Sequence, residues 1–477
     1  MLKALKKKQK RKEKDLSGLF NPESVAVIGA SHSELKLGGV VLKNLLRLKR
    51  RIRIFPVNPK FPRLMGIKAY PSVEGIKGKI DLAIIIRPAP ETPSILEALT
   101  GKASCALVVS AGFAEAGQAG LQDEVLRTAR KGGIILMGPN CMGVYNATTG
   151  LDTFILPPER LPRPRAGGTA IVTQSGAVLS LLFEGMAKTD MGVSITAHYG
   201  NAADIDESDI YEYLENDAGT EAVICYLESV RDGRRFIKRA KALSEKKPLI
   251  ILKAGKGAAG QAAAFSHTGR LAGAYEVFHS VLAQYGIFEA CDFEDLMDGA
   301  LALSTQWKDL KHKNKNRNKN KKTSKGNRVL VLTNGGGAGV LASDECTRQG
   351  FEQPEIPPAN LENFRKIFPP FYGMGNPFDL TAQGSDRDYL YILRELGDGL
   401  SFFDGFIIIA LTAVTGITPA LAGMLADFKK RTGRPMVLHT GQDEAGRELG
   451  REARKAGIPS FDTPERAVRA LGHLLSW

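Results

Sequence analysis

A histidine that follows a run of small residues has the most specific chemistry in this chain. The segment KAGKGAAGQAAAFSHTGRLAG (253–273) places His267 after Gly and Ala residues that predict a mobile loop, and His267 is expected to begin the next helix. An imidazole there can accept a phosphoryl group on a ring nitrogen and pass it on. Such a ring needs a carboxylate to fix its tautomer, and Glu228, at the end of the predicted strand AVICYLE, is the candidate. A lone histidine is more often a surface or core residue, so this hypothesis needs support from the other motifs.

A second motif, TQSGA (173–177), joins a predicted strand to a predicted helix. Ser175 and Gly176 are expected at the N-terminus of that helix, where free backbone N–H groups bind phosphate. A serine nucleophile would require the pattern G-x-S-x-G, but Thr173 stands where its first glycine belongs. The motif therefore favours a phosphate-binding turn over a nucleophile.

The first strand-turn-helix motif, VAVIGASHSELKLGG, indicates which nucleotide could bind. A nicotinamide site would carry G-x-G-x-x-G, but Gly29 is followed by Ala30 and Ser31. The second strand ends in VNPK, so Asn58 and Lys60 stand where a dinucleotide site has an acidic residue for the ribose hydroxyl. This pair suits a phosphorylated ribose, which points to coenzyme A. A surface lysine after a strand is the equally supported alternative.

Three further strands end in motifs of small residues, RPAP (87–90), SAGFAE (110–115) and GPNCMG (138–143). Ligands of open α/β sheets bind at the carboxyl ends of strands, and small residues let a ligand approach the backbone there. Cys141, within the last motif, is expected to be a small buried hydrophobe. These motifs extend the candidate ligand site along one edge of the first sheet.

The elements that position these residues alternate between short apolar runs and amphipathic stretches, which is typical of parallel sheets with helices on both faces. A proline-rich segment (156–168) separates the first α/β unit from the second. A Lys/Asn-rich tract without helical or strand period (308–328) separates the second from the third. The predicted organisation is a basic disordered arm at 1–18, α/β units at 19–150, 165–305 and 328–477, and a flexible linker at 306–327.

Composition and charge exclude several classes of protein. The 477 residues are 43% hydrophobic and 24% charged, and no apolar run is long enough to span a membrane. The net charge is +14, but residues 1–14 and 308–328 together hold +16, so the rest of the chain is nearly neutral and nucleic acid is not expected as the main partner. Five scattered cysteines without metal-ligand spacing predict neither a disulfide framework nor a metal site, and they fit a cytoplasmic protein.

With these motifs in this order, the chain resembles the nucleoside-diphosphate-forming acyl-CoA synthetases, relatives of succinyl-CoA synthetase. AAFSHTGRLAG is the most specific part of the resemblance, and TNGGGAG (333–339) and NPFDL (376–380) carry it into the third unit. It implies an α/β protein in which a Rossmann-like CoA-binding domain precedes two flavodoxin-like, succinyl-CoA-synthetase-like domains. The implied reaction is acyl-CoA + ADP + phosphate ⇌ carboxylate + ATP + CoA, through a phosphohistidine.

The resemblance also implies a role for each matching residue. His267 would be the phosphorylated histidine, and Glu228 would be the carboxylate that orients it. The phosphate would lie between two helix N-termini, one at Ser175 and Gly176 and the other at His267 and Thr268. Coenzyme A would bind in the first domain, with its thioester near Asn140. The residues implied for coenzyme A are Gly29, Ser31, Lys60, Pro88, Gly112 and Asn140.

The family's ATP-grasp subdomains, which bind nucleotide and Mg²⁺, have no visible counterpart in this sequence. Some relatives carry them on a separate β subunit, so the resemblance implies an α subunit in a heterotetramer, with ADP, ATP and Mg²⁺ bound mainly by the β partner. The implied small-molecule substrates are phosphate and a carboxylate such as acetate or its CoA thioester. A CoA-binding regulatory protein without turnover is the alternative; the presence of His267, Glu228 and Ser175 disfavours it. The missing glycine fingerprint disfavours an NAD-linked dehydrogenase.

Overall fold

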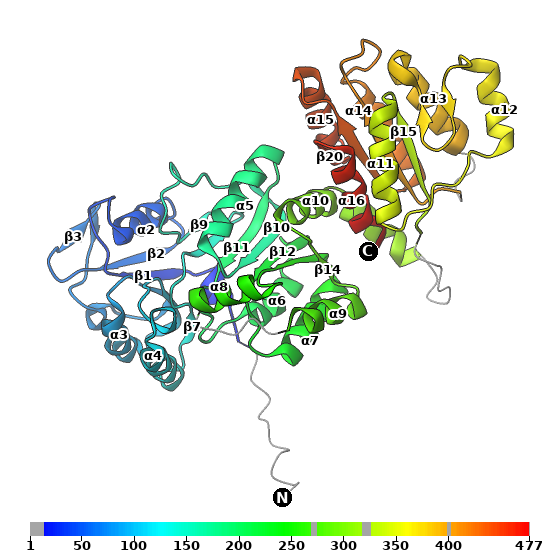
Figure 1. Cartoon of the computed structure of the whole chain (residues 1–477). Helices are drawn as coiled ribbons and strands as arrows, with labels where there is room; N and C mark the ends of the chain where they lie inside the picture. The colour runs from blue at the N-terminus through cyan, green and yellow to red at the C-terminus, as the bar shows by residue number, and fades with distance from the viewer. Residues whose placement is uncertain (1–13, 269–273, 317–325, 398–401, 477) are drawn as a thin grey trace, which may run out of the picture. The chain divides into compact units, whose positions relative to one another are not determined.

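The structure is a computed structural model that describes residues 14–268, 274–316, 326–397 and 402–476, apart from the side chains of 264–268 and 308–316. It divides into two compact units, Met1–Glu289 and Ala290–Trp477. Mostly parallel strands alternate with helices in both, as the sequence predicts (Figure 1). Among the described residues, no helix has the length and apolar character needed to cross a membrane.

The first sheet is parallel throughout, in the order β2-β1-β5-β6-β7. Each of its strands was predicted from an apolar run: β1 (Ser24–Ile28), β2 (Arg53–Val57), β5 (Ile80–Ile85), β6 (Ala103–Val108) and β7 (Ile135–Met137). The same part of the chain contains α1 (Ser17–Phe20), α2 (Leu37–Leu46), α3 (Thr92–Leu99), α4 (Ala119–Lys131), the hairpin of β3 (Arg63–Leu64) and β4 (Ile67–Lys68), and 3-10 turns at Val73–Gly75, Ala89–Glu91 and Ala114–Ala116.

Helices cover both faces of this sheet, because the side chains of its strands alternate between them. Val25 and Val27 of β1 pack in the same core cluster as Leu42 of α2. Ala26 and Ile28 pack in a second cluster, which includes side chains of α3 and α4. Figure 1 shows α3 and α4 side by side along the sheet. The carboxyl ends of the strands are thereby left at one edge, between the two helical layers.

The second sheet has the order β14-β13-β12-β10-β11-β8-β9. Its parallel strands are β10 (Ala166–Thr173), β11 (Val193–His198), β12 (Ala222–Leu227), β13 (Leu249–Lys253) and β14 (Phe288–Glu289). Its helices are α5 (Gly176–Thr189), α6 (Glu207–Asn216), α7 (Gly233–Ser244), α8 (Ala258–Thr268) and α9 (Tyr275–Tyr285). The sequence analysis ended the first unit at residue 150, whereas β8 (Gly143–Asn146) and β9 (Leu151–Asp152) join the second sheet in antiparallel pairing.

The segment before His267 is a helix and not the predicted loop. Because α8 spans Ala258–Thr268, His267 and Thr268 are the last two residues of a helix, and the prediction that a helix begins at His267 is wrong. Residues 258–264 read AAGQAAA, and alanine has the highest helix propensity of all residues. The small side chains that suggested a loop with little to bury therefore favour a helix.

The C-terminal unit contains a sheet in the order β16-β17-β15-β18-β19-β20, parallel except for β16. Its strands are β15 (Val329–Thr333), β16 (Gly373–Met374), β17 (Phe378–Asp379), β18 (Gly405–Ala410), β19 (Met436–Thr440) and β20 (Ser460–Phe461). Its helices are α10 (Phe293–Asn316), α11 (Gly336–Arg348), α12 (Pro358–Ile367), α13 (Asp386–Gly397), α14 (Leu421–Thr432), α15 (Glu444–Lys455) and α16 (Pro464–Ser476), with a 3-10 turn at Thr381–Gln383.

Helix α10 packs on α16 within this unit. The guanidinium of Arg466 donates hydrogen bonds of 2.6 and 2.8 Å to the carboxylate of Asp298, and His473 Nε2 lies 2.8 Å from Asp295 Oδ1. The sequence analysis predicts that the second α/β unit extends to residue 305, and the compact unit that contains both α10 and α16 begins at Ala290.

The borders of the two basic tracts are ordered. Lys14 Nζ pairs with Asp204 at 2.8 Å and Leu16 is buried, so the predicted disordered arm is packed from Lys14 onward; residues 1–13 lie outside the described part. Helix α10 runs into the Lys/Asn tract as far as Asn316. Lysine propagates a helix readily once packed residues have nucleated it. The rest of the tract, 317–325, again lies outside the description.

Candidate functional site

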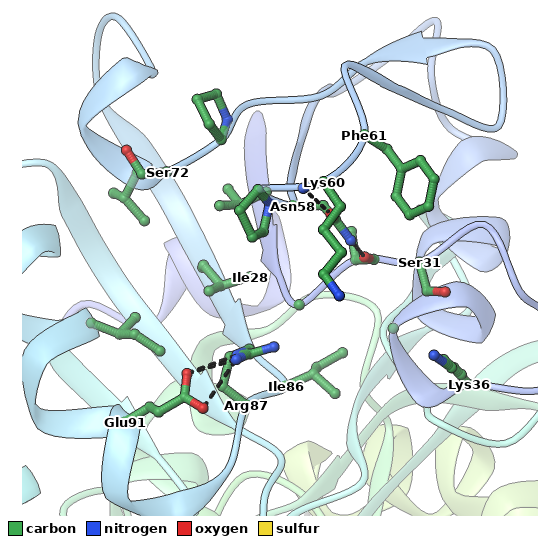
Figure 2. A pocket seen from close by; sticks show the side chains of 18 of the residues that line it. Ile28, Ser31, Lys36, Asn58, Lys60, Phe61, Ser72, Ile86, Arg87 and Glu91 are labelled. Carbon is green, nitrogen blue, oxygen red and sulfur yellow. Dashed lines mark hydrogen bonds and ion pairs between the residues drawn. The ribbon is translucent and has the colours of Figure 1, made fainter.

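A cavity of about 910 Å³ lies at the carboxyl ends of β1, β2 and β5. Gly29, Ser31 and Lys60, three of the residues predicted for coenzyme A, line it. Figure 2 shows the side chains of Lys60 and Arg87 extending into the same hollow, with Ser31 and Lys36 at its side. Motifs that are far apart in the sequence therefore converge on one site.

Gly29 forms the floor of the turn that follows β1. Its φ is +92°, a conformation that residues with a side chain rarely adopt. A Cβ atom at this position would lie 2.2 Å from the carbonyl oxygen of Ile86, so no side chain fits. The turn consequently keeps its backbone exposed to a ligand in the cavity.

Asn58 connects the loop after β2 to the turn after β1 through hydrogen bonds. Its Nδ2 donates to the carbonyl oxygen of Ala30 at 2.8 Å, and its Oδ1 accepts from the backbone N–H of Lys60, also at 2.8 Å. These bonds hold the loop that presents Lys60 against the turn that contains Ser31. Asn58 is thus the structural support of the predicted phosphate contact.

The cavity is lined by three cationic side chains, Lys36, Lys60 and Arg87, and by two carboxylates, Glu74 and Glu91, so one positive charge is in excess. In the described part of the chain, no carboxylate pairs with Lys36 or Lys60, whereas Arg87 is held by Glu91 through bonds of 2.9 and 3.0 Å. The phosphate groups of coenzyme A would balance this excess of positive charge, so the residues present fit that ligand. The sequence analysis missed Lys36 and Arg87; Arg87 opens the motif RPAP, from which only Pro88 was selected.

The other residues predicted for coenzyme A do not line the cavity. Pro88 precedes the 3-10 turn Ala89–Glu91. Gly112, with φ +105°, donates its N–H to Glu115 Oε1 at 2.6 Å. Asn140, with φ +56°, donates from Nδ2 to Asn201 Oδ1 at 3.3 Å. The three residues follow β5, β6 and β7 in order along the sheet edge, as their motifs predicted, but outside the cavity.

The predicted phosphate turn stands at the N-terminus of α5. Ser175 caps the helix, and its hydroxyl oxygen accepts from the N–H of Val178 at 3.3 Å. The N–H of Ser175 is itself bonded to Thr173 Oγ1 at 3.0 Å. A Cβ on Gly176 would lie 2.6 Å from Met142 Sδ, so the Met142 side chain packs directly against the first helical residue. Ser175 and Gly176 therefore begin the helix where the sequence places them.

Glu228 is buried directly after β12, the neighbour of β10. The side-chain oxygen of Gln174 accepts hydrogen bonds from the N–H groups of Glu228 at 2.5 Å and Ser229 at 3.0 Å. One carboxamide thus joins the phosphate turn to the strand end that carries Glu228. In the sequence analysis Gln174 appeared only as the second residue of the TQSGA motif, without a role of its own.

Lys253 is a buried cation beside Glu228 that the sequence analysis did not single out. Its Nζ donates to the carbonyl oxygen of Glu228 at 2.8 Å and also to that of Ala254. Burial lowers the pKa of Lys253 to about 8, although the negative charges of Glu228 and Glu289 oppose this shift. A lysine at the end of an otherwise apolar strand, PLIILK, was the available signal.

His267 and Thr268 end helix α8, and their side chains lie outside the described part of the chain. The helix follows β13, which pairs in parallel with β12. The connection into α8 therefore leaves the sheet at the same edge as Glu228. Contacts of the His267 ring with Glu228 or with the phosphate turn remain a prediction.

The described residues contain no group of three or more His, Cys, Asp or Glu side chains placed to hold a metal ion. Cys141 is buried, and burial raises the pKa of its thiol far above the ordinary value. A thiol in that state is neutral and packs as a small hydrophobe, as predicted.

In the C-terminal unit, the turn after β15 has the same hydrogen-bonding pattern as the predicted phosphate turn after β10. Thr333 Oγ1 accepts from the N–H of Gly335 at 2.9 Å, directly before α11. Asn334 Oδ1 accepts from the N–H of Leu411, the residue after the neighbouring strand β18, at 2.8 Å. Leu411 therefore occupies the position that Glu228 holds beside the first turn.

Comparisons with known proteins cover the same three parts of the chain. A CoA binding domain model matches residues 23–147, a succinyl-CoA ligase like flavodoxin domain model matches 166–303, and a Ligase-CoA domain model matches 329–419. The alpha subunit of the ADP-forming acetate–CoA ligase I of Pyrococcus furiosus is 35% identical over 477 residues, with 97% of each chain covered. The ADP-forming acetate–CoA ligase I of Archaeoglobus fulgidus is also 35% identical, over 96% of this chain, which spans 63% of that relative's length.

A solved structure matches almost the whole chain. It is an acetyl-coenzyme A synthetase from Ca. Korarchaeum cryptofilum in complex with phosphate and ADP, 31% identical, with a TM-score of 0.84 over 97% of this chain and 96% of that one. The fold and the three matching domain models define an α/β protein of the CoA ligase class, which confirms the predicted fold class. The chain belongs to the nucleoside-diphosphate-forming acyl-CoA synthetases, as a homologue of the alpha subunits of ADP-forming acetate–CoA ligases.

Proposed function

We propose that the chain is the catalytic α subunit of an ADP-forming ligase that converts acyl-CoA, ADP and phosphate into carboxylate, ATP and CoA. The observation that carries the proposal is the bond from the backbone of Glu228 to Gln174, which holds a buried carboxylate beside the phosphate turn in the unit that also contains the Lys60 cavity. The names of the relatives support acetyl-CoA, or a thioester close to it, as the substrate.

The reaction proceeds in three transfers. An oxygen of phosphate attacks the thioester carbonyl carbon, the C–S bond breaks, and CoA leaves with the electron pair on sulfur. A ring nitrogen of His267 then attacks the phosphorus of the acyl phosphate, and the P–O bond breaks to release the carboxylate. Finally an oxygen of the ADP β-phosphate attacks the phosphohistidine, the P–N bond breaks, and ATP forms.

The residues of this chain bind and orient the reactants. Lys60 pairs with the ribose phosphate of CoA, and Asn140 lies near the thioester. The N–H groups at the start of α5, after Ser175, hold the phosphate, because a helix N-terminus favours negative charge. Glu228 accepts a hydrogen bond from the N–H of the His267 ring and stabilises the positive charge that the ring gains on phosphorylation.

A second polypeptide completes the site. We propose an ATP-grasp β subunit that binds ADP and Mg²⁺, in a heterotetramer with this chain. The coverage supports this arrangement, since the chain spans an alpha subunit of P. furiosus almost completely but only 63% of the longer relative.

Phosphorylation of His267 tests the proposal directly. The complex with the β subunit, incubated with Mg²⁺ and ATP labelled in the γ-phosphate, should acquire an acid-labile, base-stable label. His267→Ala should abolish it, while His279→Ala, on the exposed surface of α9, should leave it unchanged. Full labelling of His267→Ala would refute the assignment.

Turnover without the partner separates an enzyme subunit from a regulatory CoA-binding protein. The chain alone should bind CoA but release negligible CoA from acetyl-CoA with ADP and phosphate, and addition of the β subunit should restore the reaction. ATP synthesis by the pure single chain would instead reveal a nucleotide site within it. Absence of turnover with every ATP-grasp partner and acyl-CoA tested would favour the regulatory protein.

A further inference from the structure

His198 lies between the two loops on which the proposed chemistry depends. It is the last residue of β11 and is buried. On one side it pairs with Thr173, which leads into the phosphate turn. On the other it pairs with Gly143, which follows the loop 138–142 that contains Asn140. No residue motif drew attention to this histidine in the sequence.

The imidazole of His198 bonds to both loops. The backbone N–H of Met142 donates to Nδ1 at 2.7 Å, and Nε2 lies 3.0 Å from the carbonyl oxygen of Gln174. A backbone N–H can only donate and a carbonyl oxygen can only accept, so Nδ1 carries no proton and Nε2 carries one. The geometry thus assigns the neutral Nε2–H tautomer to this ring.

The imidazole ring of His198 also lies next to Gly176, the first residue of α5. A Cβ built on Gly176 would lie 3.8 Å from His198 Cε1 and 2.6 Å from Met142 Sδ. The residues after His198 continue the contact, because Tyr199 N–H donates to Thr173 O at 3.2 Å and Asn201 N–H donates to Pro139 O at 3.0 Å. The segment 198–201 therefore spans from one loop to the other.

We propose that His198 is a positioning residue that sets the spacing between the phosphate turn and the loop of Asn140. This role rests on the proposed function, in which phosphate on the turn attacks a thioester beside that loop. The attacking oxygen and the carbonyl carbon must meet in one orientation, and loss of that orientation is costly to the rate. A neutral imidazole suits this task, because its two nitrogens accept and donate in opposite directions from one rigid ring.

Steady-state kinetics of the complex with the β subunit test this role. His198→Phe keeps a ring of similar shape but removes both hydrogen bonds, so we expect KM for phosphate to rise and kcat to fall, each by roughly tenfold. The Kd of the single chain for CoA should stay within about twofold, because the Lys60 cavity shares no residue with this contact. A purely structural role would lower the melting temperature without this separation of phosphate from CoA.

Two conservative variants keep the test decisive if the phenylalanine variant folds poorly. His198→Asn retains an acceptor near Nδ1, and His198→Gln retains a donor near Nε2, so each should recover part of the phosphate KM. His279→Phe on α9 is the matched control and should behave as wild type. Wild-type kinetics in all three His198 variants would overturn the role of His198 and leave the proposed function standing. A wild-type complex that forms no phosphohistidine would overturn the proposed function as well.

The tautomer gives a readout that does not depend on activity. In the full chain labelled with ¹⁵N-histidine, the signals lost in His198→Phe identify this ring. They should show a protonated Nε2 and an unprotonated Nδ1 at neutral pH. An imidazolium or an Nδ1–H tautomer at this position would contradict both hydrogen bonds and the proposal built on them.

Discussion

The ammonium group of Lys253 donates a hydrogen bond of 2.8 Å to the carbonyl oxygen of Glu228. It also donates to the carbonyl oxygen of Ala254, from which the chain continues into α8. One buried cation therefore connects the strand end that carries the proposed orienting carboxylate to the start of the segment that ends with His267. The cation also makes the folded state sensitive to pH.

We expect Lys253 to make the free energy of unfolding rise with pH. Burial lowers its pKa from 10.5 to about 8, so between these values the unfolded chain binds a proton that the folded chain does not. Stability must rise with pH over that window, and Lys253→Met should abolish this contribution. The difference in free energy of unfolding between wild type and Lys253→Met should therefore change with pH. It should grow in favour of wild type by on the order of 2–3 kcal/mol from about pH 7 to about pH 10.

Denaturant titrations followed by circular dichroism across this pH range measure that difference. Lys238→Met removes an exposed lysine from α7 and serves as control, with an expected pH-independent difference from wild type. Parallel pH profiles for wild type and Lys253→Met would contradict the prediction.

Lys60→Gln should weaken CoA more than dephospho-CoA. Removal of one charged contact to the ribose phosphate costs about 1–2 kcal/mol, which is roughly tenfold in Kd, and dephospho-CoA lacks that phosphate. Calorimetric titration of the single chain with both ligands measures the difference. Lys68→Gln, an exposed lysine outside the cavity, should bind both as wild type does. Equal losses for the two ligands, or tighter binding of NAD than of CoA, would show that Lys60 has another role.

Gly29→Ala should destabilise the chain far more than Gly101→Ala. Both glycines have positive φ, +92° and +71°, but an added Cβ meets Ile86 O at 2.2 Å in the first case and nothing within 4 Å in the second. We expect a loss of about 3 kcal/mol or more at Gly29 and about 1 kcal/mol at Gly101. Thermal unfolding of the two variants provides the comparison, and similar melting temperatures would argue against the close approach at Gly29.

Glu228→Gln should slow phosphorylation of His267 without unfolding the chain. The amide still accepts a hydrogen bond, but it stabilises a positively charged ring less than a carboxylate does, so we expect a decrease of about tenfold or more. Quenched labelling with the β subunit and ATP measures the rate. Glu245→Gln, at the exposed end of α7, is the control. An unchanged rate in Glu228→Gln would remove this residue from the mechanism.

Apolar runs were sufficient to predict the long parallel strands, because strands buried on both faces consist almost entirely of such residues, as in IDLAII and GFIIIA. The turn at Ser175 and the cavity around Gly29 and Lys60 followed from local motifs at strand ends. Helix α8 was missed because glycine and alanine are compatible with a loop as well as with a helix. The helix propensity of the alanines in 258–264 was the available signal for a helix, and the sequence analysis gave it too little weight.

The remaining differences arise from contacts between distant residues. Strands β8 and β9 are short, and they became strands through pairing rather than through their own composition: β8 pairs with β11, and β9 pairs with β8. The pairing of Lys14 with Asp204 cannot be inferred from a lysine-rich tract in which any residue could make it. Likewise, the bonds of His198 to Met142 and Gln174 exist only because three separate segments end side by side.

The turn after β15 has the same hydrogen-bonded frame as the turn after β10, yet it presents Leu411 where the other presents Glu228. In both places the neighbouring strand is held through its backbone N–H, so the frame does not depend on which side chain follows that strand. The hydrogen bond that joins position 228 to Gln174 therefore does not require a glutamate there, because it uses only the backbone N–H. Evolution could gain or lose the carboxylate there by a change at a single codon, without rebuilding the loop that receives it.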